Sequence, residues 1–259
     1  MKKLSVFFLL LCSMVYGQQQ IVPADTVVWK DISDVQIDDL GYFLLYNSQK
    51  QSFTKYDAAG LPVATIGFRH PFRIPSVQNS LRYPAFSQNL QELSFLDARL
   101  AVTEKIKFPL TLGFIRAVFV EDLQEAWLLE ESRQRLIQYN YREDQILQEI
   151  PFPISFAEVN DFLIYRREIF LLTKNALQVY NLRGQLLKQI LVENARRLRR
   201  ENKTIFVLTD QAVLQLSDDL LQITFTCPQC RFVDKNSTGY LGMTEDKLYL
   251  YPLKKEAVK

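Results

Sequence analysis

Cys227 and Cys230 form a Cys-Pro-Gln-Cys motif, whose spacing is that of a thiol oxidoreductase. Redox chemistry of that kind needs a helix N-terminus to lower the pKa of the attacking thiol, whereas the residues after Cys230 favour a strand. A structural zinc site needs four ligands, and this pair with the single histidine of the chain does not supply them. We therefore expect a disulfide that clamps a turn in an oxidising compartment. Redox activity and free thiols remain the alternatives.

The only histidine, His70, lies in the segment GFRHPFRIPS together with Arg69 and Arg73. Such a loop could grip an anion or a partner protein. The alternative is a loop that Pro71 and Pro75 stiffen while its arginines face water. A Ser-His-Asp triad would have to use His70, and the G-x-S-x-G pattern of a nucleophile elbow is absent from the sequence.

The densest positive charge is the run RRLRR at residues 196–200, and a second pair precedes it at Arg166 and Arg167. If both groups reach the same opening of the fold, they form a local basic rim. The alternative is that they lie in solvated loops. Arg166, Arg167, Arg196 and Arg199 are therefore candidate binding residues, together with Arg69, His70 and Arg73.

The elements that must position these side chains come from a repeat. Residues 41–67 predict three short strands joined by two tight turns, and approximate copies recur down the chain. The shared feature is a strand that ends in a turn-forming Asp, Asn or Ser, whose side chain can accept hydrogen bonds from backbone amides about two residues on. These residues lie 40, 43, 41 and 36 positions apart, at Asp57, Asp97, Asn140, Asn181 and Ser217.

Self-similarity at about 40 residues, with strands only, indicates the blades of a β-propeller. The inner strands should be buried on both faces and therefore be apolar throughout, as FLLY, AWLL, IFLL and IFVL are. Residues 121–140 are rich in helix formers, and a mixed α/β fold is the rival interpretation. We favour strands there because the segment aligns with other copies that carry more β-branched and aromatic residues.

The first 17 residues have the features of a signal peptide: Lys2 and Lys3, an apolar stretch too short to cross a bilayer, and small residues at Val15 and Gly17. Cleavage after Gly17 leaves 29 basic against 29 acidic residues. This neutral balance argues against nucleic acid as a partner. We expect a periplasmic or secreted protein with no transmembrane segment in its mature form.

The strand count is one too many at the start and one too few at the end. We predict six blades in an all-β domain, with residues 26–30 closing the ring as the outer strand of the last blade. Residues 18–25 are then a flexible lead-in to a single domain over residues 26–259. The expected blades are residues 31–67, 68–109, 110–153, 154–193, 194–228 and 229–253 plus 26–30.

The pattern of a strand, Tyr-Asp or Tyr-Asn, a turn and an amphipathic strand resembles NHL-type six-bladed propellers. Phe53, Tyr56, Asp57 and Gly60 stand at the family positions. The chain is also similar to small exported propellers of Bacteroidetes, some of which associate with outer-membrane secretion machinery. Propeller lactonases bind calcium through acidic and amide side chains at the channel mouth, and Asp34, Asn79, Asn160 and Asp161 could stand there. The spacing of these four residues is no different from what chance would give, so we predict no metal, cofactor or catalytic residue.

The leading hypothesis is an exported, non-enzymatic propeller that binds a protein or another envelope component through its inter-blade loops. A metal-dependent hydrolase of the lactonase type is the first alternative. A thiol oxidoreductase acting through Cys227 and Cys230 is the second.

Overall fold

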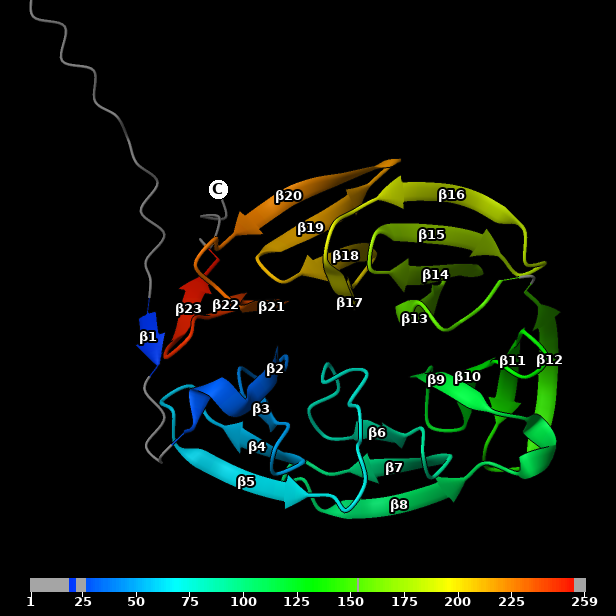
Figure 1. Ribbon diagram of the computed structural model, residues 1–259, viewed down its shortest axis with the longest axis horizontal. Helices are drawn as coiled ribbons and strands as arrows, with labels where there is room; N and C mark the ends of the chain where they lie inside the picture. Colours follow the sequence, from blue (N-terminus) through cyan, green and yellow to red (C-terminus); the bar gives the residue numbers. More distant parts are fainter. Residues whose placement is uncertain (1–18, 22–26, 153, 254–259) are drawn as a thin grey trace, which may run out of the picture.

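The computed structural model describes residues 19–21, 27–152 and 154–253. The predicted signal peptide therefore lies outside the described residues. Six small antiparallel sheets stand around a central channel, and in five of them the strands follow one another in chain order from the channel outward (Figure 1). The prediction of an all-β, six-bladed propeller is confirmed. No helix within the described ranges has the length and apolar character needed to cross a bilayer.

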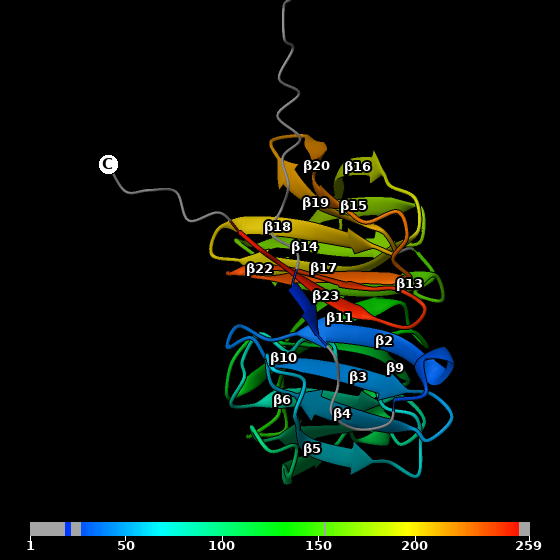
Figure 2. The same ribbon diagram turned by 90° about the vertical axis from the view of Figure 1, so that its left-hand side faces the viewer.

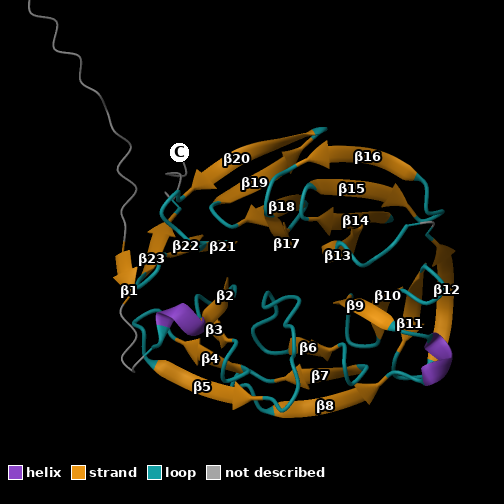
Figure 3. Ribbon diagram, in the orientation of Figure 1, coloured by secondary structure: helices purple, strands orange, loops and turns teal. Residues whose placement is uncertain are grey.

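The strands of each blade are named from the innermost to the outermost. Blade 1 holds β2 (Ile32–Ile37), β3 (Phe43–Asn47), β4 (Ser52–Tyr56) and β5 (Pro62–Gly67), and blade 2 holds β6 (Tyr83–Ser87), β7 (Glu92–Leu96) and β8 (Val102–Lys107). Blade 3 holds β9 (Ile115–Val120), β10 (Glu125–Glu130), β11 (Arg135–Asn140) and β12 (Gln145–Pro151), and blade 4 holds β13 (Val159–Tyr165), β14 (Glu168–Thr173), β15 (Ala176–Asn181) and β16 (Leu186–Leu191). Blade 5 holds β17 (Ala195–Glu201), β18 (Thr204–Thr209), β19 (Ala212–Ser217) and β20 (Leu220–Thr226), and blade 6 holds β21 (Phe232–Asn236), β22 (Gly239–Met243), β23 (Leu248–Pro252) and β1 (Gln19–Ile21). Two 3-10 turns, η1 (Trp29–Asp31) and η2 (Leu110–Leu112), are the helical elements of the described residues (Figure 3).

The second strand of a blade explains the apolar runs in the sequence. In β3, Phe43 and Leu45 pack toward blade 6, while Leu44 packs toward blade 2. Strand β10 divides its residues in the same way between blades 2 and 4. Because both faces of such a strand are buried, the alternation of polar and apolar residues disappears. The helix-forming composition of residues 121–140 is overridden by this burial, and the segment forms the hairpin β10–β11.

The turns between the third and fourth strands use the predicted side-chain chemistry. The Oδ1 atom of Asp57 accepts hydrogen bonds from the N–H groups of Ala59 and Leu61, both at 2.9 Å. Asp97 and Asn181 make the same pair of contacts in blades 2 and 4. In blades 1 and 4 a glycine, Gly60 or Gly184, takes the left-handed position of the same turn, and in blade 2 Leu100 takes it.

The N-terminal strand closes the ring, but not with the residues that the sequence predicts. Strand β1 pairs with β23 in blade 6, with Gln19 opposite Leu250 and Ile21 opposite Leu248. Figure 2 shows β1 lying beside β23 next to β2. Trp29 and Lys30 of the predicted closing segment belong to η1 instead, and residues 19–21 of the expected flexible lead-in are the closing strand. Trp29 still packs against the cluster between blades 6 and 1.

Blade 2 lacks a regular innermost strand. A single bridge between Arg73 and Phe86 marks the place where that strand would pair with β6. Pro84 is tolerated in β6 because the strand has this almost unpaired edge, where a missing N–H costs little. The segment at residues 68–82 is thus released from the sheet and enters the channel.

Candidate binding sites at the two mouths of the channel

Three arginines of β17 reach across the channel to blade 1. Arg196 lies 3.1 Å from the Oδ1 atom of Asp34, and Arg197 is hydrogen-bonded to the other oxygen of that carboxylate. Arg199 donates to the carbonyl of Ile37 at 2.8 Å and to Asp39. Along these contacts the residue numbers of β17 and β2 increase together, so the two strands run parallel. We call the opening where the innermost strands begin the N-terminal mouth and the other the C-terminal mouth.

The charges in the channel titrate in different directions. Burial opposes ionisation of Asp34, but Arg197 and Arg196 outweigh that cost and hold the pKa of the carboxyl below its usual range. Burial raises the pKa of Asp161 and of Asp234 above the usual range, although arginines and backbone N–H groups oppose the shift. Of these three carboxyl groups, only Asp34 therefore gains from ionising in this environment.

The segment at residues 68–82 divides the channel. Arg73 lies 3.3 Å from Asp161 of blade 4, and the amide of Gln36 in blade 1 donates to the carbonyl of Ile74 at 3.0 Å. The Gln78 amide donates to the carbonyl of Arg200 in blade 5. Because one segment contacts three other blades, the channel is split into two cavities that share Pro75 and Asp161 as lining residues.

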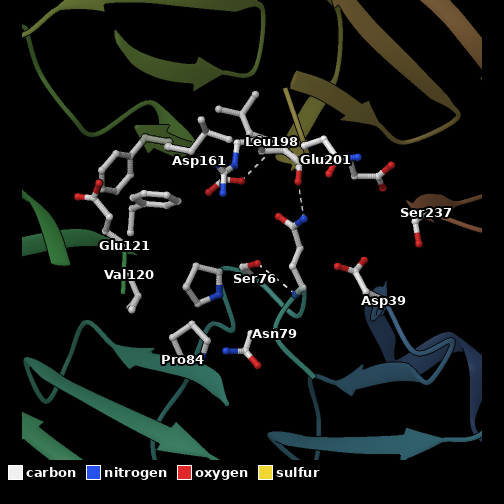
Figure 4. Close-up of a pocket in the computed structure, with 17 residues that line it drawn as sticks. Asp39, Ser76, Asn79, Pro84, Val120, Glu121, Asp161, Leu198, Glu201 and Ser237 are labelled. Atoms are coloured by element: carbon white, nitrogen blue, oxygen red, sulfur yellow. Dashed lines mark hydrogen bonds between the residues drawn. The ribbon is translucent and has the colours of Figure 1, made fainter. Parts of the chain in front are cut away.

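The cavity at the C-terminal mouth has a volume of about 470 Å³. Ser76 and Asn79 of the blade 2 segment face Asp161 and Leu198 across it, and Glu201 and Asp39 stand at its edge (Figure 4). Several of its carboxylates are already engaged, since Arg199 contacts both Asp39 and Glu201.

The cavity at the N-terminal mouth has a volume of about 450 Å³. Phe72, Arg73 and Phe86 line one side, and Arg116 lines another. Arg116 is held by the carbonyl of Ala157 at 3.1 Å and lies 3.9 Å from Glu131. Arginines and aromatic rings thus share this cavity.

A buried triad joins blades 1 and 2 behind the C-terminal mouth. The Tyr83 hydroxyl donates to Asp38 at 2.7 Å and accepts from Lys55 Nζ at 2.8 Å. Lys55 and Asp38 are 3.7 Å apart and almost fully buried. Burial lowers the pKa of Lys55 and raises that of Tyr83. Neither of the two channel cavities is lined by these groups, and their hydrogen bonds connect the two blades.

The residues predicted to bind a partner fall into three places. Arg69 and His70 are exposed on the connection to blade 2, and Arg73 lines the N-terminal cavity. Arg166 and Arg167 are exposed in the β13–β14 turn at the C-terminal mouth. Arg196 and Arg199 instead belong to the ion-pair network inside the channel.

Some channel residues carried no signal in the sequence. Arg116 is the only charged residue of the otherwise apolar strand β9, and Asp234 follows an ordinary apolar residue. Each has a partner far away in the chain, Ala157 at 41 positions from Arg116 and Ile37 at 197 positions from Asp234. Only the arrangement of the blades brings such residues together.

The four residues considered as metal ligands do not fit a cation. Asp34 is neutralised by two arginines, and the Asn160 amide donates to the carbonyl of Ala195 at 2.7 Å. Asn79 and Asp161 line opposite sides of the C-terminal cavity. Within the described ranges no group of three or more His, Cys, Asp or Glu side chains could hold a metal ion.

Cys227 and Cys230 are joined as a disulfide, with their Cα atoms 5.3 Å apart. Both are 2% exposed and belong to the apolar cluster between blades 5 and 6. The bond closes a turn after β20, with the Cys230 N–H donating to the Cys227 carbonyl at 2.9 Å. The predicted disulfide is present, and its burial suits a structural clamp.

The chain is similar in structure to several solved propellers. Selenomethionine-substituted virginiamycin B lyase from Staphylococcus aureus matches with a TM-score of 0.56 and 9% identity, over 91% of this chain and 99% of that chain. A streptogramin B lyase matches with a TM-score of 0.56 and 9% identity, over 92% of this chain and 88% of that chain. BamB from Moraxella catarrhalis matches with a TM-score of 0.46 and 10% identity, over 87% and 84%.

At these identities the similarity shows the fold alone. The class of protein is therefore a six-bladed β-propeller. No protein-family model and no curated protein sequence matches the chain. The NHL-type assignment stays a prediction.

Proposed function

We propose that this chain is an exported, non-enzymatic β-propeller that binds a polypeptide partner of the cell envelope at its N-terminal mouth. The observation that carries this proposal is the cavity of about 450 Å³ between the blade 2 segment and Arg116. It combines aromatic rings with two guanidinium groups. These are the side chains that dominate the binding energy of protein interfaces.

The blade 2 segment is prepared for binding by its own rigidity. Phe68 and Phe72 stack with their ring centroids 4.1 Å apart. Pro71 and Pro75 restrict the backbone on either side of Arg73. A loop that is already ordered loses little conformational entropy when a partner binds.

The charges of the mouth define the partner chemistry. Arg73 keeps 45% of its side chain exposed while it contacts Asp161, and Arg116 keeps 33% exposed. Arg69 and His70 add exposed donors on the same segment. Guanidinium groups pair well with carboxylates. The fitting partner segment therefore carries an acidic side chain next to an apolar one that enters the cavity. A protein of an outer-membrane secretion assembly that presents such a segment would suit this mouth.

Site-specific photo-crosslinking tests the proposal. A photoreactive phenylalanine analogue at position 72 should form an adduct of discrete mass with an envelope protein in living cells. The same analogue at Thr65, exposed on the outermost strand β5, serves as the matched control and should form none. Adding R73A and R116A should abolish the adduct while the far-ultraviolet circular dichroism spectrum stays unchanged. Equal adducts at both positions, or an adduct that survives the double substitution, would contradict the proposal.

The non-enzymatic part is tested separately with purified protein. Lactone substrates should show no turnover above that of a buffer blank, with or without added Ca²⁺. Turnover that is lost in D161N would overturn this part and favour the hydrolase alternative.

A further inference from the structure

The turns around the C-terminal mouth carry a row of exposed leucines. Leu40, Leu81 and Leu123 stand in the turns between the first and second strand positions of blades 1, 2 and 3. Their side chains are 67%, 72% and 63% exposed. Each of three neighbouring blades thus presents one large apolar side chain at this mouth.

Each of these turns is held in one conformation by a side-chain cap. Asp38 accepts a hydrogen bond from the N–H of Leu40 at 2.9 Å, and Asn79 accepts one from the N–H of Leu81 at 3.1 Å. Asp122 accepts from the N–H groups of the two residues that follow Leu123, at 2.7 and 2.8 Å. The leucines therefore stay exposed because the turn backbone is fixed, and their exposure is a property of the folded state.

The next two blades present cations at the same mouth. Arg166 and Arg167 form the β13–β14 turn, Arg200 lies near the end of β17, and Lys203 stands in the β17–β18 turn. All four are exposed, and none forms an ion pair within the part of the chain that the structure describes. The guanidinium carbons of Arg166 and Arg200 lie 5.2 and 4.9 Å from the ring centroid of Tyr165, which supports both.

The arginine turn is strained. Arg166 and Arg167 have φ angles of 51° and 64°, in the left-handed region. A two-residue hairpin turn of this type favours Asn-Gly, because residues with a longer side chain pay a steric cost there. Arginine at both positions gives no stability advantage. The two guanidinium groups are therefore held at this place at a steric cost.

We propose that the C-terminal mouth docks on an anionic lipid bilayer, with Leu40, Leu81 and Leu123 entering the interface and the four cations contacting headgroup phosphates. Binding at a bilayer surface depends on buried apolar area and on electrostatic attraction. The leucines of blades 1 to 3 supply the apolar area, and the cations of blades 4 and 5 supply the attraction.

Two observations favour a bilayer over a protein as the occupant. The leucines lie on three blades and share no cavity, since Leu40 and Leu123 line separate ones and Leu81 lines neither. A fluid bilayer interface can take up leucine side chains that lie apart from one another, whereas a protein interface needs a contiguous packed core. The charge is also divided between the two halves of the mouth. Asp39 beside Leu40 pairs with Arg199, while among the described residues Glu121 and Asp122 beside Leu123 accept only from the Trp127 indole and from backbone N–H groups and keep their negative charge. The uncompensated positive charge therefore lies on blades 4 and 5, where headgroup phosphates would bind.

Flotation with lipid vesicles tests the proposal, using protein purified after export of the full chain. Vesicles of phosphatidylcholine mixed with phosphatidylglycerol should carry the protein upward, and vesicles of phosphatidylcholine alone should carry at least about tenfold less. The triple variant L40S/L81S/L123S should lose at least about tenfold in partitioning to the mixed vesicles. The matched control L110S/L191S removes two leucines that are 92% and 79% exposed at the opposite end of the propeller, and it should float like wild type.

The variant R166N/R167G separates binding from stability. Asn-Gly relieves the strained turn, so this variant should melt at a higher temperature than wild type and still float less with the mixed vesicles. The proposal is overturned if wild type fails to float with the mixed vesicles, or if it floats equally with both kinds. It is also overturned if the leucine triple variant or R166N/R167G floats like wild type, or if the control variant loses as much as the triple variant. Failure of the crosslinking at position 72 would leave these outcomes unchanged, because the two mouths are tested independently.

Discussion

The carboxylate of Asp234 in blade 6 accepts a hydrogen bond from the backbone N–H of Ile37 in blade 1 at 2.8 Å. Asp161 in blade 4 makes the same contact with Leu198 in blade 5, also at 2.8 Å. An innermost strand has no neighbouring strand on its channel side, so an N–H group that points there needs another acceptor. The two aspartates meet this need and thereby fasten one blade to the next.

Replacing Asp234 by alanine should therefore destabilise the fold strongly. The substitution leaves the N–H of Ile37 unpaired and removes a carboxylate 4.0 Å from both Arg197 and Arg199. We expect a loss of about 3 kcal/mol in the free energy of unfolding, as for a broken buried pair, measured by urea denaturation. Asp219, whose side chain is 81% exposed and contacts Lys188, is the matched control. D219A should stay within about 0.5 kcal/mol of wild type. Equal effects of the two substitutions would refute the fastening role.

The acid sensitivity of the fold should change in opposite directions when Asp34 and Asp161 are replaced by asparagine. The pKa of Asp34 is lowered in the folded state, so its stabilisation is present at neutral pH and is lost as the pH falls through that folded value. D34N should be less stable at neutral pH and lose less stability on acidification.

The pKa of Asp161 is raised in the folded state, so wild type regains stability as the pH falls through that value toward the ordinary carboxyl range. D161N lacks this gain and should lose stability more steeply than wild type. Urea unfolding at a series of pH values measures both slopes, and slopes that shift in the same direction would show that one assignment is wrong.

Ring closure should depend on Ile21. This side chain is 3% exposed and packs in the cluster between blades 6 and 1, while its backbone pairs with Leu248. I21A should cost about 2 kcal/mol or more in the free energy of unfolding, the lower end for a buried Ile-to-Ala change. Val28, which is 38% exposed, is the control, and V28A should be nearly neutral. If a calorimetric scan gives both variants the same melting temperature, β1 does not hold the ring.

Two glycines should respond differently to alanine. A Cβ atom on Gly113 would lie 2.3 Å from the buried Oε1 atom of Glu130, and Gly113 has a φ of +85°. A Cβ atom on Gly67 would meet nothing within 4 Å. G113A should therefore destabilise by more than about 1 kcal/mol, while G67A should be neutral. Thermal melts of the two single variants decide this, and a neutral G113A would mean that the Glu130 side chain moves aside at little cost.

The disulfide should be intact in protein taken after export. Mass spectrometry without reductant should find the chain two hydrogen masses lighter than its reduced form. Replacing both Cys227 and Cys230 by alanine should cost less than about 3 kcal/mol, because the loop they close is short. Two reactive thiols in freshly exported, denatured protein would contradict the bond.

The sequence alone determined the architecture because the information is local. Apolar runs such as FLLY and AWLL require strands that are covered on both faces, and a turn-forming Asp or Asn follows at an almost constant interval. The Oδ1 atom of Asp57 closes its turn with two N–H groups no more than four positions away. Patterns of this range can be recognised without knowing the fold. The CPQC motif belongs to the same class, since its partners are three residues apart.

Only the tertiary structure decided what the charges do. In the sequence Arg196 and Arg199 resemble a basic surface run, and in the structure they pair with Asp34 and Asp39, which lie 162 and 160 positions away. A repeat places similar strands around an axis but does not state which side chains meet at that axis. The closing strand shows the same limit. A count of strands requires one from the N-terminus, but residues 19–21 rather than 26–30 pair with β23, because a pairing between the two ends of the chain leaves no local pattern in the sequence.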